Sequence, residues 1–379
     1  MERRRALAAA FLLLSCLAAS GCSDSGIRYY NLGVDAARRD DLDEAIGYWR
    51  RSLEYNPGDP DTRYNLGMAL MEKGLYEEAE ENFRRAEDVR PADHELQYAL
   101  GLALEKQGDY PDAKKAYRYS VNLKTGFYPP YLGMARIAIE QSQYGTAEKY
   151  ATEALRYSPR DAEGNLLLSR AYHEQGNFQA AYGQLVASGP WLRDEPGYHL
   201  LLGKVMNARH MYADALITLR KARDAGVSGA DLFLELGKAS YETGSYDEAV
   251  EYYKLAIFRD SGSAPAWIGL ARTYFELGEF EESRRAWEEA SSLSPREPEI
   301  SLGLAMVNLR LSRPSEAAAI LETLVSREDT PPRAYYYLGH ARMMLGRKDA
   351  ARESFEEFIR SWSGDPALIE EVREILVTF

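Results

Sequence analysis

The sequence predicts an all-α fold, a solenoid of ten helix-turn-helix repeats, each of about 34 residues, closed by one further helix. Two observations predict it. A Leu-Gly signature recurs at a constant spacing, as in NLG at 31–33 and 65–67 and ELG at 235–237, and small residues return at two fixed positions of every repeat. A constant spacing of this length is typical of arrays in which each helical hairpin buries its apolar face against its neighbours.

The first residues of the chain have the features of an export signal. Three arginines at 3–5 precede an apolar run over 6–17 that is too short to span a bilayer, and small residues fill 19–21. With Cys22 next, this order resembles the lipobox of bacterial lipoproteins, although the lipobox prefers Leu where this chain has Ala19. The resemblance implies a signal peptide over 1–21, a diacylglyceryl group on the Cys22 thiol and a lipidated tether over 22–25.

Two alternatives stay open for this segment. Cys16, preceded by Leu13-Leu14-Ser15, is a second match, but cleavage there would leave an apolar mature end; an ordinary signal peptide with an incidental cysteine is the other. Since these are the chain's two cysteines, acylation of Cys22 would leave the mature chain without a disulfide or a thiolate metal site. Ser23, rather than Asp, follows Cys22, and the resemblance then favours the outer membrane, facing the periplasm.

The charge of the chain argues against nucleic acid as a partner. Its formal net charge is −13, and removal of the signal takes away more basic than acidic residues, so the mature chain is more acidic still. With 45% hydrophobic and 28% charged residues the composition is typical of a folded protein, and no second apolar run is long enough to span a membrane.

The repeats follow one another without insertion or deletion over 26–365. They start at residues 26, 60, 94, 128, 162, 196, 230, 264, 298 and 332. Position 8 is always Gly, Ala or Ser, and position 20 is Ala in nine repeats and Ser283 in the other, which lets the two helices of a hairpin approach closely. An often aromatic position 24 fills the seam beside them. Gly at position 15 in six repeats suits a left-handed turn between the helices.

At these spacings the chain resembles the tetratricopeptide repeat family. The repeat over 267–295 carries Trp267, Leu270, Tyr274 and Pro295 at the family's positions. The resemblance implies a right-handed superhelical solenoid whose first helices line a concave groove that binds partner proteins. Residues 366–379, with apolar side chains on one helical face, resemble the C-terminal capping helix that closes such arrays.

Two joints depart from the repeat pattern. One is KTGFYPP at 124–130, and in repeat 5 the sequence SGPWLRDEPG at 188–197 predicts that the second helix is cut short. Each joint is expected either to bend the array, to form a small binding loop, or to be a tolerated loop without a role.

A catalytic site is not expected. The five histidines are scattered without the paired spacing of metal ligands, and the chain has neither a phosphate-binding glycine loop nor a nucleophile elbow. The sequence therefore predicts a binding protein that is not an enzyme and has no cofactor.

The resemblance to the family implies that the groove is lined chiefly by positions 2, 5, 9 and 12 of each first helix, which fall on one helical face. Position 5 is apolar throughout. Position 9 is apolar in the first three repeats and then basic in five successive ones, which suggests a stripe that receives carboxylates: Arg136, Arg170, Lys204, Lys238 and Arg272. The alternative is that these bases form exposed pairs with glutamates one helical turn on, at position 13, since four of the five repeats have such a glutamate.

The first three repeats offer a different groove chemistry. Their position-5 tyrosines and two asparagines resemble family grooves in which rings hold side chains and amides hold a peptide backbone: Tyr30, Asn31, Tyr64, Asn65 and Tyr98. Asn at position 6 is also common in the family at large, which favours a structural role.

Taken together, the sequence predicts a membrane-anchored periplasmic scaffold. It would hold an extended peptide or a helix of a partner protein in its groove, in the assembly of an envelope machine such as a pilus, a secretion system or a polysaccharide exporter. The alternative is that the groove binds an anionic envelope polymer directly.

Overall fold

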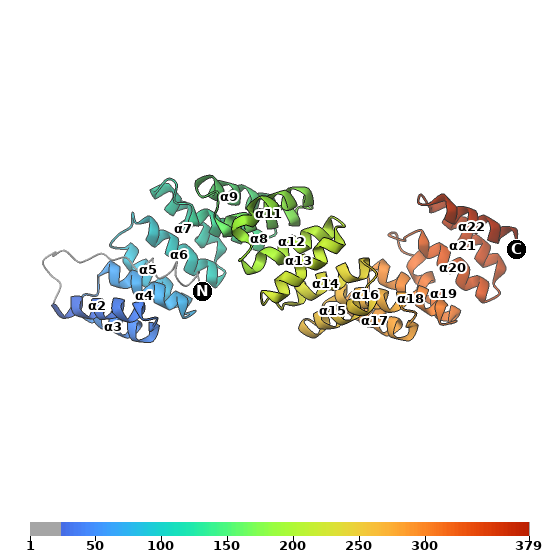
Figure 1. Cartoon of the computed structure of the whole chain (residues 1–379), viewed down its shortest axis with the longest axis horizontal. Helices are drawn as coiled ribbons and strands as arrows, with labels where there is room; N and C mark the ends of the chain where they lie inside the picture. The colour runs from blue at the N-terminus through green and yellow to red at the C-terminus, as the bar shows by residue number, and fades with distance from the viewer. Residues whose placement is uncertain (1–23, 379) are drawn as a thin grey trace. The chain divides into compact units, whose positions relative to one another are not determined.

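In the computed structural model, residues 24–378 are described, and over that span the chain forms twenty-one helices and no strand (Figure 1). Within each of the two units described below, each helix packs against the next one along the chain. The all-α fold of stacked helix-turn-helix pairs is therefore confirmed. Within the described residues there are ten such pairs, α2–α3 to α20–α21, followed by the single helix α22.

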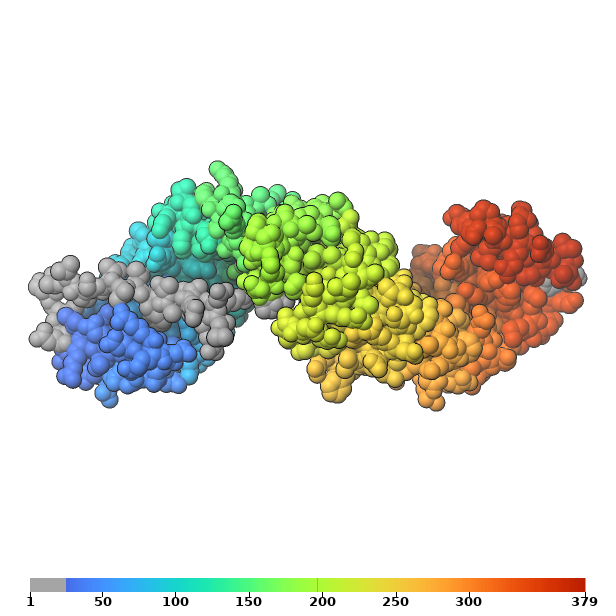
Figure 2. Space-filling model, viewed as in Figure 1, coloured from blue at the N-terminus to red at the C-terminus, as the bar shows by residue number. Residues whose placement is uncertain are grey.

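The chain divides into two compact units, residues 1–192 and 193–379. The helices described in the first unit are α2 (Asp24–Arg38), α3 (Leu42–Tyr55), α4 (Pro60–Glu72), α5 (Tyr76–Glu87), α6 (His94–Gln107), α7 (Tyr110–Leu123), α8 (Pro129–Glu140), α9 (Tyr144–Tyr157), α10 (Ala162–Glu174) and α11 (Phe178–Leu192). In the space-filling view the colours of this unit follow one another from blue to green, so each hairpin lies beside its neighbour in sequence (Figure 2).

The second unit continues the same arrangement. Its helices are α12 (Pro196–Ala208), α13 (Tyr212–Asp224), α14 (Ala230–Glu242), α15 (Tyr246–Arg259), α16 (Ala264–Glu276), α17 (Phe280–Leu293), α18 (Pro298–Arg310), α19 (Pro314–Val325), α20 (Arg333–Met344), α21 (Lys348–Ser361) and α22 (Pro366–Val377). Helices this short are marginal alone in water, so their stability comes from stacking.

In several repeats an aromatic side chain at position 24 packs between one hairpin and the next, as Tyr117 does. A Cβ added to Gly101, at position 8 of repeat 3, would lie 2.6 Å from the ring of Tyr117 in the same repeat. A Cβ added to Gly133, in repeat 4, would lie 2.5 Å from the far side of that ring. Tyr117 is fully buried between the two backbones. Small residues at these positions are therefore what lets one ring join two repeats.

The corner between the two helices of a hairpin is left-handed at position 15 of every repeat. Six of the ten corner residues are glycines with φ between 73° and 81°: Gly74, Gly108, Gly176, Gly244, Gly278 and Gly346. The other four are Asp40, Ser142, His210 and Ser312, with φ between 55° and 64°, and no other non-glycine residue in the described part of the chain has a positive φ. The corner is thus a property of the repeat, with or without glycine.

The joint at 124–130 is packed onto its own repeat. The ring of Phe127 lies 4.8 Å from that of His94 and 5.7 Å from that of Tyr98, both edge-on. Pro129 then begins α8 in the first turn, where the missing N–H has no helical partner.

The prediction that the second helix of repeat 5 is cut short is wrong. Helix α11 runs through Pro190 to Leu192. The carbonyl that loses its N–H partner belongs to Val186, whose side chain is 51% exposed, while Ser188 and Leu192 are buried and hold the last turn in place. Proline near a helix end costs less than in the interior because few hydrogen bonds follow it.

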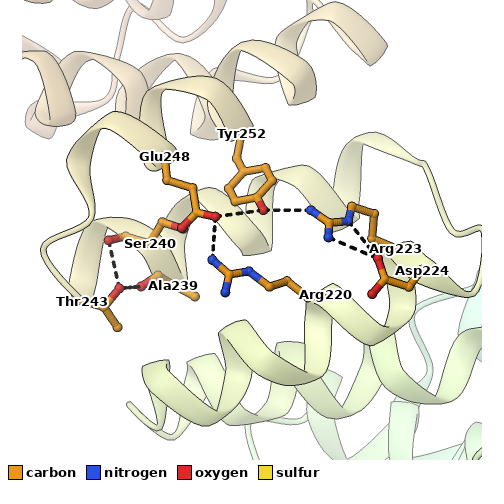
Figure 3. A network of polar contacts seen from close by, with 8 residues as sticks. All are labelled: Arg220, Arg223, Asp224, Ala239, Ser240, Thr243, Glu248 and Tyr252. Carbon is orange, nitrogen blue, oxygen red and sulfur yellow. Dashed lines mark hydrogen bonds and ion pairs between the residues drawn. The ribbon is translucent and has the colours of Figure 1, made fainter.

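Polar contacts also join the second helices of neighbouring repeats (Figure 3). Arg220 on α13 donates to Glu248 on α15 at 2.6 Å, and the Tyr252 hydroxyl donates to the same carboxylate at 3.2 Å. Arg223 donates to the Tyr252 oxygen at 3.2 Å and also contacts Asp224. These partly exposed bonds add modestly to the apolar contacts beneath them.

Helix α22 covers the last hairpin. Asp365 caps its start by accepting from the Ala367 N–H at 2.9 Å. Val372 is fully buried, and Leu368, Ile375 and Leu376 pack beside it against the rings of repeat 10. Part of the apolar surface of α20 and α21 is thereby removed from water.

Candidate functional site

The second unit contains a hollow of about 490 Å³ on the face of its first helices. Four aromatic rings, two aliphatic side chains and four charged side chains line most of it: Tyr241, Phe275, Trp287, Tyr337, Leu302, Met306, Arg272, Glu299, Glu276 and Arg333. Apart from Trp287, Glu276 and Tyr337, these residues stand at positions 2, 5, 9 and 12 of repeats 7–10. A mainly apolar hollow with a few charges at its rim is typical of a site for one or two side chains of a ligand.

The first unit has a smaller and more polar hollow of about 350 Å³. It lies between repeats 3, 4 and 5 and is lined by Glu105, Lys106, Tyr110, Arg136, Ile137, Ile139, Glu140, Leu167 and Arg170. Two of the five bases predicted to form the stripe, Arg136 and Arg170, therefore reach one hollow.

Three of the five predicted bases form ion pairs with an acid at position 2 of the next repeat. Arg136 contacts Glu163 at 2.6 Å, Lys204 contacts Asp231 at 2.9 Å, and Arg272 contacts Glu299. We call these three pairs the inter-repeat rungs. The acids stand in the first turn of a helix, where the macrodipole favours negative charge.

The remaining two bases have no such partner. Position 2 of the following repeat is Gly197 for Arg170 and Pro265 for Lys238. Both bases are exposed, and among the residues that the structure describes neither forms an ion pair. Arg170 and Lys238 are thus cations on the first-helix face whose charge is available to a ligand.

The alternative, in which the bases pair with the glutamate at position 13, does not occur among the described residues. Glu140, Glu242 and Glu276 form no ion pair, and Glu174 contacts His173 at 3.3 Å. In the three inter-repeat rungs, the acid at position 2 of the next repeat takes the place of the glutamate one turn on.

Arg136 contacts two glutamates, one on each side of its own repeat. It donates to both oxygens of Glu105, at 2.7 and 2.9 Å, in addition to its rung with Glu163. Burial lowers the pKa of the guanidinium, but the bonds and charges of the two glutamates outweigh it and raise the pKa above its usual value. The Tyr117 hydroxyl also donates to Glu105. Arg136 therefore holds repeats 3, 4 and 5 together.

Comparisons with known proteins agree with this architecture. Two models described as tetratricopeptide repeat match residues 30–94, 64–126 and 309–366 in one case and 138–205 in the other. A model described as the C-terminal domain of cilia and flagella-associated protein 70 matches 195–325. The chain is a tetratricopeptide repeat protein.

The relatives of this tetratricopeptide repeat protein are distant. It is 26% identical over 139 residues to the human protein O-mannosyl-transferase TMTC1, covering 37% of this chain and 16% of the relative. It is 20% identical over 224 residues to the TPR repeat-containing protein YpiA of Bacillus subtilis, covering 58% and 52%. The chain thus spans about half or less of the curated relatives it matches.

Among solved structures, the chain matches one described as the APC/C hetero-tetramer Cut9-Hcn1. It is 14% identical, covers 92% of this chain and 90% of that one, and has a TM-score of 0.47. Tetratricopeptide repeats mediate protein–protein interactions as scaffolds and are typically not catalytic, so the class of the chain is a binding protein.

Most of the groove residues predicted in the first tetratricopeptide repeats are packing residues. Tyr30 and Tyr64 are 9% and 8% exposed, and the Tyr30 hydroxyl accepts from Asn65 at 3.2 Å. Tyr98 is partly buried against Tyr117, and burial raises the pKa of its hydroxyl to about 12. These side chains offer little surface to a ligand, and a ligand-binding role for them stays a prediction.

Asn31 and Asn65 occupy the same position of two repeats but differ in environment. Asn65 is buried against Tyr30 of the preceding repeat, whereas Asn31 is exposed, since no repeat precedes it in the described part of the chain. The same signature therefore has a structural role inside the array and a free side chain at its start.

Several features of the site were not found from the sequence. The acids of the inter-repeat rungs were overlooked, although a base at position 9 followed by an acid at position 2 of the next repeat is a visible signal. The aromatic residues at position 12 of repeats 7 and 8, Tyr241 and Phe275, are a further signal in the sequence for this lining.

The proposed lipidation site, Cys22, and the signal peptide lie outside the described residues. Among residues 24–378 no helix is long and apolar enough to cross a membrane. In the same span no group of three or more His, Cys, Asp or Glu side chains is placed to hold a metal ion.

Proposed function

We propose that this tetratricopeptide repeat protein is a lipid-anchored periplasmic scaffold that binds a segment of a partner protein on its first-helix face. The hollow of repeats 7–10 carries the proposal. It combines about 490 Å³ of mainly apolar space with Arg272, Glu299 and Arg333 at its rim, which suits an extended segment or a helix that inserts one or two apolar side chains.

The anchor rests on the sequence around Cys22. A lipid there would place the array on the periplasmic face of the outer membrane, and the combination of fold and anchor supports a role in assembling an envelope machine such as a pilus, a secretion system or a polysaccharide exporter.

A photo-crosslinking amino acid in the hollow tests the binding site. We expect a residue at Met306 to capture one polypeptide in intact cells, while a residue at Phe258, which is 78% exposed on the second helix α15, captures none. Equal capture from both positions, or none from Met306, would refute the site. Fractionation of the envelope and mass analysis of the mature N-terminus test the location and the lipid separately.

A second candidate function is direct binding of an anionic envelope polymer. The unpaired cations Arg170 and Lys238 favour it, whereas the commitment of the other three bases to inter-repeat rungs leaves no continuous basic stripe. Salt-sensitive retention on an acidic glycan that is lost in an Arg170→Gln/Lys238→Gln variant would support the polymer. Retention that these changes leave untouched would exclude this stripe as the polymer site.

A further inference from the structure

Three tyrosine rings and an arginine form a partly exposed cluster on the first hairpin. Tyr29 on α2 stacks on Tyr48 and Tyr55 of α3, with ring centroids 6.3 and 5.8 Å apart. The guanidinium of Arg51 lies 5.8 Å from the centre of the Tyr29 ring. Tyr55 is 49% exposed. We call these four residues the tyrosine patch.

The patch lies around the end of the hairpin where the chain enters α2. The Ser52 hydroxyl donates to the Gly26 carbonyl at 2.9 Å, which fixes the last turn of α3 beside the first turn of α2. In repeat 2 the residue equivalent to Tyr29 is Arg63, which is buried and donates to the Pro57 carbonyl of the preceding repeat at 2.9 Å. The first repeat has no such neighbour among the described residues, so its rings keep an open side.

This place is close to Cys22 along the chain. Cys22 stands two residues before α2, a reach of about 7 Å at full extension. Tyr29 is five residues into the helix, or about 7.5 Å further along its axis. A lipid on Cys22 would therefore hold the patch within about 15 Å of the hydrocarbon boundary, a reach that includes the headgroup layer, which is about 5–8 Å thick on each side.

We propose that the tyrosine patch lies in the headgroup layer of the membrane and fixes the orientation of the first hairpin on it. The proposal rests on the proposed lipid at Cys22. Tyrosine favours this layer because its ring is apolar and its hydroxyl can bond to water or phosphate. Arg28 and Arg51 are exposed, form no ion pair within residues 24–378, and supply positive charge for anionic headgroups.

A single environment-sensitive dye tests the proposal. With Cys22 acylated the mature chain has no free thiol, so a cysteine introduced by Glu54→Cys, beside Tyr55, can be labelled alone. Asp43→Cys is the matched control, since it is exposed on the same helix about 16 Å away. The lipidated protein is placed in vesicles of phosphatidylethanolamine and phosphatidylglycerol.

We expect the dye at position 54 to emit at shorter wavelength and to be quenched by a lipid-borne quencher, and the dye at 43 to behave as in water. Tyr29→Ser/Tyr55→Ser should abolish the difference, with circular dichroism showing that the array is still folded. If that variant unfolds, Tyr55→Ser alone is used, because half of its ring is already exposed.

The possible failures are distinguishable. Equal, water-like emission from both positions with the acyl group present on Cys22 overturns the patch and leaves the scaffold proposal intact. Absence of the acyl group overturns both. A shift at position 54 that grows with the protein-to-lipid ratio assigns the patch to a second copy of the chain, which also overturns the membrane proposal.

Discussion

The left-handed corner at position 15 gives a prediction in which substitutions at different repeats change the free energy of unfolding in opposite directions. An L-residue in this conformation costs about 1–2 kcal/mol relative to the right-handed one, and glycine avoids the cost. At Gly278, where φ is 77°, an added Cβ would meet no atom within 4 Å, so alanine there adds no clash. We expect Gly278→Ala to lower the free energy of unfolding by about 1 kcal/mol through the backbone alone.

The opposite change should stabilise. Ser312 has φ 56° at the same position of repeat 9. Ser312→Gly relieves the corner but also loosens the unfolded chain, so the net gain is about 0.5 kcal/mol. Gly47 is the control. It lies inside α3 with nothing within 4 Å of an added Cβ, and Gly47→Ala should stabilise by about 0.5–1 kcal/mol.

Hydrogen exchange of the amides flanking each corner measures these changes locally, which avoids treating a repeat array as a two-state system. Urea titration gives the corresponding midpoints. If Gly278→Ala and Gly47→Ala shift the free energy in the same direction, the corner conformation is not what glycine serves here, and the reasoning fails.

Three further predictions concern the seams and the last repeat. Gly133→Ala places a Cβ 2.5 Å from the Tyr117 ring and should cost about 1–3 kcal/mol in urea titration, whereas no loss would show that the ring can move aside. Arg136→Met leaves two glutamates without their cation beside a half-buried seam and should lower the free energy of unfolding by more than about 1.5 kcal/mol. Lys204→Met should lower it by less than about 1 kcal/mol, because the acid of that rung is exposed. Similar losses from the two variants would contradict the difference in burial of the acids. Burial lowers the pKa of His340 although Glu371 opposes it, so the unfolded chain binds its proton more readily and stability should fall as pH drops below about 6.5. His340→Phe should show a smaller loss of midpoint between pH 7.5 and 5.5 than the parent chain, and an unchanged loss would place the acid sensitivity elsewhere.

The constant spacing of the repeats was sufficient to predict the hairpins because every repeat obeys it. The same spacing predicted the turn at the six glycines. Four other residues adopt that turn against their local preference, because the packed helices on either side impose it: Asp40, Ser142, His210 and Ser312. Helix α11 was misjudged for a similar reason: Pro190 argues for a break, while burial of Leu192 keeps the helix whole.

The candidate site was harder to predict than the fold. Whether a base at position 9 is neutralised depends on the residue at position 2 of the next repeat. That contact lies between two helices, so the faces of a single helix do not predict it. Tyr30 and Tyr64 share their position with groove residues, yet burial between hairpins decides their environment. Sequence positions identified the face, and side-chain packing decided which members of it are accessible.

The inter-repeat rungs alternate, occurring after repeats 4, 6 and 8 and failing after repeats 5 and 7. In this stretch the electrostatic unit is consequently a pair of hairpins, twice the structural one. Loss of repeat 5 or of repeat 7 alone would bring the base of the preceding repeat against Gly197 or Pro265. Lengthening or shortening the array here by two hairpins at a time preserves every match, which gives protein engineers a rule for resizing it.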